Sequence, residues 1–194
     1  MERMSTDDTY DVLRALARHV PSDQAIVEIG TYQGASAVAL GEGSRNGNKA
    51  HVYSIDPHDL PGERTTTGKG PLPANPVDYT DPAIRRAAQR NIRDAGLDSI
   101  VTLIRGFSTD VAAEWPQEEP VGLLFIDGDH RQSAVRRDYA AWEPHLAETA
   151  YIAWDDYNPG FPGVIKAVEQ LISKGLITAP IFRGNIAVAQ KVKR

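Results

Sequence analysis

The sequence predicts an α/β protein in which a doubly wound, mostly parallel sheet lies between two layers of helices and ends in a C-terminal antiparallel hairpin. Short apolar runs alternate with segments of helical periodicity, the pattern of a parallel sheet with crossover helices. The last two apolar runs, 176–182 and 186–192, are separated by only three residues, which is short enough for a hairpin. No internal repeat divides the 194 residues, so we expect a single domain over residues 1–194.

Five of the apolar runs are the predicted parallel strands. Each is four to six residues long and has the composition of a strand that is buried on both faces. The predicted strands are 25–29, 50–55, 100–104, 121–126 and 151–154.

Helices are indicated by apolar residues at helical spacing and by capping residues. Asp81 and Pro82 begin one helix, as its N-cap and first helical residue, and Gly96 ends it. The other predicted helices are an N-terminal one capped by Ser5, Thr6 or Asp7 and stopped by Pro21, 34–41, 108–115 with Ser108 as N-cap, one that contains Val135, Tyr139, Trp142 and Leu146, and 164–174.

Residues 57–80 have no usable periodicity. They contain five prolines and three glycines. An irregular segment of this length inside a domain is usually functional or mobile. We therefore expect it to form part of the substrate site or a lid over that site.

Composition and net charge indicate which class of molecule the protein binds. The chain is 41% hydrophobic and 24% charged, with a formal net charge of -5. Nucleic-acid binders usually carry a basic surplus, so we expect a small-molecule substrate and no nucleic acid. The absence of cysteine excludes disulfides, a thiolate nucleophile and a thiolate zinc site. We see no secretory leader and no apolar run of the ~20 residues that cross a bilayer, so we expect a cytoplasmic protein without membrane contact.

A glycine turn and an aspartate follow the first two predicted strands, at the edge where open α/β sheets bind ligands. Gly30 and Gly34 allow a ligand to approach the backbone, although glycines needed only for packing give the same pattern. Their G-x-x-x-G spacing departs from the G-x-G-x-x-G of dinucleotide-binding folds. Asp56 is placed to accept from both hydroxyls of a ribose, and a turn aspartate before Pro57 is the alternative. Together, the three residues favour an adenosyl ligand.

More acidic residues follow the fourth and fifth predicted strands. Asp127, Asp155 and Asp156 would meet at one edge, where their oxygens suit a hard cation such as Mg²⁺, although the last two also fit a simple turn. His130 could act as a general base, with Asp129 as the competing residue. A histidine in a helical N-terminus capped by Asp129 is the alternative.

Four strings along the chain resemble class I methyltransferases that use S-adenosyl-L-methionine (SAM). They are VEIGTYQGAS, YSIDP, LLFIDGDH and IAWDDY. The nearest branch is that of small O-methyltransferases, both catechol O-methyltransferase-like and metal-dependent sugar O-methyltransferase-like. The resemblance implies a Rossmann-like fold and transfer of a methyl group to a hydroxyl of a small molecule with Mg²⁺ assistance.

The resemblance also implies roles for individual residues. The residues that match SAM-binding positions are Glu28, Gly30, Tyr32, Gly34, Ser36, Asp56, Ser108 and Asp127. Asp56 stands where catechol-type enzymes have glutamate. The implied metal ligands are Asp127, Asp155 and Asp156. His130 stands where catechol-type enzymes have a lysine base, and Asp129 matches an acid of the sugar-type enzymes, so the identity of the base stays open.

Three alternatives to this function remain. One is an NAD(P)-dependent oxidoreductase, against which the missing dinucleotide fingerprint and the closing hairpin argue. Another is a SAM-dependent methyltransferase that acts on RNA. The third is a SAM-binding module without activity. The sequence leaves the oligomeric state open, with a homo-oligomer among the alternatives.

Overall fold

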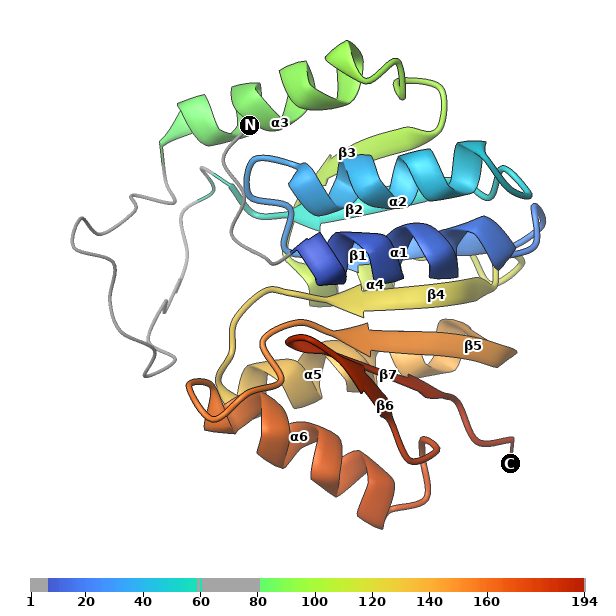
Figure 1. Cartoon of the computed structure of the whole chain (residues 1–194), viewed down its shortest axis with the longest axis vertical. Helices are drawn as coiled ribbons and strands as arrows, with labels where there is room; N and C mark the ends of the chain where they lie inside the picture. Colours follow the sequence, from blue (N-terminus) through green and yellow to red (C-terminus); the bar gives the residue numbers. More distant parts are fainter. Residues whose placement is uncertain (1–6, 59, 61–80, 194) are drawn as a thin grey trace.

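One sheet of seven strands, in the order β3-β2-β1-β4-β5-β7-β6, forms the centre of the molecule (Figure 1). The computed structural model describes residues 7–58, 60 and 81–193. The parallel strands are β1 (Ala25–Ile29), β2 (Val52–Asp56), β3 (Val101–Arg105), β4 (Val121–Ile126) and β5 (Leu146–Trp154). β7 (Ile186–Gln190) pairs antiparallel with both β5 and β6 (Ile181–Arg183). The predicted parallel sheet and terminal hairpin are therefore confirmed.

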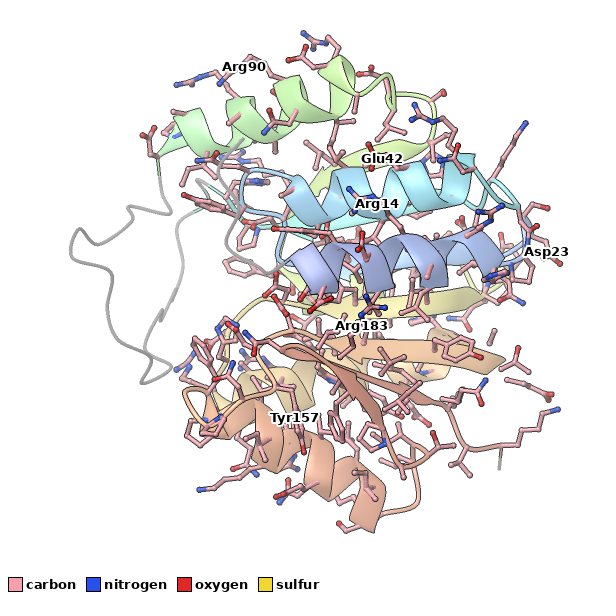
Figure 2. All side chains as sticks on the ribbon, in the orientation of Figure 1. Arg14, Asp23, Glu42, Arg90, Tyr157 and Arg183 are labelled. Carbon is pink, nitrogen blue, oxygen red and sulfur yellow. The ribbon has the colours of Figure 1, made fainter. Side chains whose placement is uncertain are left out.

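Helices cover both faces of the sheet, which confirms the three-layer prediction (Figure 1). One face carries α1 (Asp7–His19), α2 (Ala35–Arg45) and α3 (Pro82–Asp94), and the other carries α4 (Ser108–Ala113), α5 (Gln132–Trp142) and α6 (Pro162–Ser173). Neighbouring residues of β1 supply the two cores, since Ile26 packs on the first face and Val27 on the second. Arg14 of α1 donates to Glu42 of α2 at 2.8 Å and joins those helices (Figure 2).

The N-terminus of α3 is built as the sequence predicts. The Asp81 carboxylate accepts a hydrogen bond from the backbone N–H of Ala83 at 2.7 Å, and Pro82 is the first helical residue. This cap fixes where α3 begins, and Ala88 of the same helix packs against the turn at Gly34.

Two helix predictions are wrong. Leu146 belongs to β5, because α5 ends at Trp142 and a 3₁₀ turn, η1 (Glu143–His145), follows. Leu146 then pairs with Val121 of β4, so its side chain is buried although it lies in a strand. Ser108 does not cap α4, because it is the first residue of that helix and Phe107 is the N-cap; its hydroxyl instead accepts a hydrogen bond from Trp142 Nε1 at 3.0 Å.

Two further segments differ from the predictions. The first strand of the hairpin is shorter than the predicted 176–182, since only Ile177 contributes an isolated bridge, to Lys191, before β6 begins. Most of the predicted lid, and Ser5 and Thr6 of the predicted N-cap, lie outside the described residues. Within the part of the chain that the structure describes, no helix has the length and apolar character needed to cross a bilayer.

Candidate active site

The turn between β1 and α2 requires glycine at both ends. Gly30 has a φ of +92°, and a Cβ there would lie 2.2 Å from the backbone oxygen of Asp127 at the end of β4. Gly34 has a φ of +83°, and a Cβ there would lie 3.3 Å from Cα of Ala88 in α3. Both glycines therefore have a packing role. The turn also leaves the N-terminus of α2 without a side-chain cap, which makes its N–H groups available to an anionic group.

Asp56, at the end of β2, joins this turn to the second strand. Its Oδ2 accepts from the backbone N–H groups of Thr31 and Tyr32, both at 3.0 Å. Its Oδ1 accepts from the backbone N–H of His58 at 2.6 Å. The structure therefore brings Gly30, Gly34 and Asp56 to one edge of the sheet. Asp56 also closes a turn after β2, so it has the structural role that the sequence left open.

Glu28 lies on β1 just below the glycine turn and is completely buried. Its Oε2 accepts from the Ser54 hydroxyl, which also forms a 2.6 Å hydrogen bond with Thr31 Oγ1. Its Oε1 has no partner among the described residues. Burial raises the pKa of Glu28 to about 7, against the lowering effect of the Ser36 and Ser54 hydroxyls. Glu28 thus offers an unused acceptor next to the turn.

His130 lies between two acids at the ends of β4 and β5. Its Nε2 is 3.1 Å from Asp156 Oδ2 and 3.8 Å from Asp127 Oδ1. Burial lowers the pKa of His130, but the two carboxylates outweigh it and raise the pKa to about 10. Burial and the neighbouring Asp155 raise the pKa of Asp127. Phe161 packs against the imidazole with ring centroids 4.6 Å apart.

This arrangement does not fit a metal ion. Two of the predicted ligands, Asp127 and Asp156, each have a carboxylate oxygen within 4 Å of His130 Nε2, which occupies the space between them. The third, Asp155, is buried and accepts a 3.4 Å hydrogen bond from Thr9 of α1. Across residues 7–58, 60 and 81–193, no three His, Asp or Glu side chains form a group that could hold a metal ion. We therefore assign no chemical step to Mg²⁺.

Asp129 is held differently from His130. Its carboxylate forms a 2.6 Å ion pair with Arg131 Nη2 and accepts from the backbone N–H of Arg131 at 2.9 Å. It does not cap α5, whose N-cap is Arg131. The two side chains are about equally exposed, at 22% for Asp129 and 24% for His130, but the Nε2 atom of His130 is buried beside Asp127 and Asp156. Of the two predicted bases, Asp129 is therefore the one whose accepting atoms are not held between two other carboxylates.

Two residues that the sequence analysis did not select belong to this edge. Asp138 is buried on α5 beside Ser108, and burial raises its pKa to about 6 against the effect of the Ser108 hydroxyl. Its signal was an acid on the apolar stripe that contains Val135 and Trp142. His58 is buried beside Asp56 and was hidden in the irregular segment, where no periodicity marks it.

A match to a family model shows to which class of protein this chain belongs. A model of the methyltransferase-domain family matches residues 27–157, from β1 to the turn after β5. The chain belongs to this family. The match confirms the predicted resemblance to methyltransferases and places the glycine turn, Asp56 and the acids after β4 and β5 within the matched domain.

A curated relative and two solved structures resemble this chain at low sequence identity. A protein of Acanthamoeba polyphaga mimivirus without a described function is 26% identical over 167 residues, or 84% of this chain, and the chain spans 66% of its length. The O-methyltransferase NovP has a TM-score of 0.71 and 17% identity, over 95% of this chain and 80% of NovP. An O-methyltransferase from Bacillus cereus in complex with SAH has a TM-score of 0.69 and 16% identity, over 98% and 84% of the two chains. At these identities the solved structures support the fold alone.

Proposed function

We propose that this methyltransferase transfers a methyl group from SAM to a hydroxyl of a small molecule. The observation that carries the proposal is the convergence of the glycine turn, Asp56 and the unused Glu28 Oε1 at one edge of the sheet. Two fold neighbours agree with it, since NovP is an O-methyltransferase and the Bacillus cereus enzyme is in complex with SAH.

The residues present fit SAM. The uncapped N-terminus of α2 suits its carboxylate, and the orphaned oxygen of Glu28 suits a donor such as its amino group. Asp56 has a carboxylate at the position where α/β folds bind ribose. The acids along this edge suit a ligand that carries positive charge. When bound, SAM supplies an electrophilic methyl group on its sulfonium sulfur.

The protein's own residues then have two tasks. They hold the acceptor hydroxyl in line with the methyl group, which supplies much of the rate by orientation. They also take the proton that the hydroxyl loses as its oxygen bonds to the methyl carbon, and Asp129 is the base that geometry favours. His130, fixed between Asp127 and Asp156, is a positioning residue for those carboxylates.

Labelled SAM and a panel of phenols, sugars and hydroxy acids test this function. A product that carries the label is expected, and with unlabelled SAM the same product is 14 mass units heavier than its acceptor, as one methyl replaces one hydrogen. Asp129→Asn is expected to lower kcat by about 100-fold, the usual size of a general-base contribution. Asp98→Asn removes an exposed carboxylate elsewhere and is expected to leave kcat unchanged. Full activity of Asp129→Asn would assign the proton to another group.

The same assay tests the predicted Mg²⁺ requirement. EDTA treatment followed by return of Mg²⁺ measures it directly. Activity that is lost and then restored would show that His130 gives way to a metal between Asp127 and Asp156. Activity that survives EDTA would leave the imidazole as the resident partner of both carboxylates.

A further inference from the structure

His58 is a buried histidine with one unused ring nitrogen beside Asp56. Its side chain is 2% exposed, and Nδ1 has no hydrogen-bond partner among the described residues. Its Nε2 lies 3.3 Å from the carbonyl oxygen of Tyr32. Because a carbonyl only accepts, Nε2 must carry the hydrogen of that bond, and Nδ1 of the neutral ring is then a bare acceptor.

Asp56 has little free acceptor capacity of its own. A carboxylate offers about four lone-pair positions. The N–H groups of Thr31 and Tyr32 take both positions on Oδ2, and the N–H of His58 takes one on Oδ1. One position on Oδ1 remains. Asp56 alone therefore cannot accept from both hydroxyls of a ribose while the turn keeps this geometry.

A second hydrogen-bond acceptor lies next to Asp56. His58 Nδ1 lies 3.8 Å from Asp56 Oδ1, the oxygen with the free position. Two acceptors side by side match the two adjacent O–H donors of a ribose. The backbone is strained at both residues of this contact. His58 has a φ of +46°, and Tyr32, whose carbonyl lies against the His58 ring, has a φ of +48°. Strained non-glycine residues of this kind persist where the surrounding structure holds them, often at ligand sites.

We propose that Asp56 and His58 share the ribose of SAM, with Asp56 Oδ1 accepting from one hydroxyl and His58 Nδ1 from the other. This rests on the proposed use of SAM and adds His58 to Asp56 as a second ribose-binding residue.

Calorimetric titration of the full chain with SAH, 2′-deoxy-SAH and 3′-deoxy-SAH tests the shared ribose. In the wild type, removal of either hydroxyl is expected to weaken binding about tenfold, the effect of one lost hydrogen bond in a buried site. In His58→Ala, SAH is expected to bind about tenfold more weakly. One deoxy analogue should then bind His58→Ala as well as SAH does, because its missing hydroxyl no longer has a partner there.

Two variants control for folding and for the loss of any histidine. His58→Asn tolerates a positive φ and keeps an acceptor, so it is expected to bind SAH within about threefold of the wild type. His19→Ala removes an exposed histidine and should bind like the wild type. If His58→Ala weakens SAH and both analogues by the same factor, or weakens none of them, the shared ribose is refuted. If the wild type fails to bind SAH at all, the proposed function itself fails.

Discussion

At the scale of single residues, the buried carboxyl of Glu28 couples folding to pH. Its pKa rises from 4.5 to about 7 in the folded chain, because burial disfavours the charged form. The folded protein therefore holds this proton more tightly than the unfolded chain does. Stability is greatest where the group is protonated in both states, below pH 4.5. As the pH rises towards 7, the free energy of unfolding falls by about 3 kcal/mol in total because of this group.

Glu28→Gln removes this titration while keeping a group of similar size. Wild type and variant are compared by urea unfolding at pH 5 and pH 8, so that other titrating groups cancel in the difference. From pH 5 to pH 8, the free energy of unfolding of the variant is expected to rise by about 2 to 3 kcal/mol relative to that of the wild type. An unchanged difference would mean that Glu28 stays ionised in the folded chain.

At the scale of elements, a buried polar contact joins α4 to α5. Ser108 begins α4 and accepts from Trp142 Nε1 on α5, while Asp138 of the same helix lies beside its hydroxyl. Ser108 was predicted as a cap and Trp142 as part of an apolar stripe, and Asp138 was not predicted at all. Their contact spans 34 residues of sequence, so no local pattern could show it. The contact fixes α5 against the turn that follows β3, where Ser108 was predicted to bind SAM.

Ser108→Ala tests that contact. It leaves the indole N–H and the Asp138 carboxyl without their hydroxyl partner, and a buried polar group without a partner costs about 1–3 kcal/mol. Urea unfolding should show a loss of that size. Ser133→Ala, at an exposed position of α5, is the matched control and should stay within about 0.5 kcal/mol of the wild type. If Ser108→Ala and Ser133→Ala were equally stable, the contact would have no role in stability.

At the scale of the whole molecule, alternation of strands and helices was enough to predict the sheet and the edge that carries the site. Gly30, Gly34 and Asp56 were found because strand ends are visible in the sequence, and parallel strands bring those ends together. What each group bonds to was not visible, because it depends on side-chain direction across the edge. Asp56 illustrates this, since three backbone N–H groups occupy most of its carboxylate. Leu146 shows the same limit, because its apolar spacing fits a helix while η1 redirects the chain into β5.

The most direct test of the account is a calorimetric titration of SAH into the wild type, Asp56→Asn and Asp98→Asn, with thermal unfolding to confirm that each is folded. The account predicts saturable binding to the wild type and to Asp98→Asn, and binding at least about tenfold weaker to Asp56→Asn. A folded wild type that binds no SAH at millimolar concentration would contradict it. So would an Asp56→Asn variant that binds SAH as tightly as the wild type.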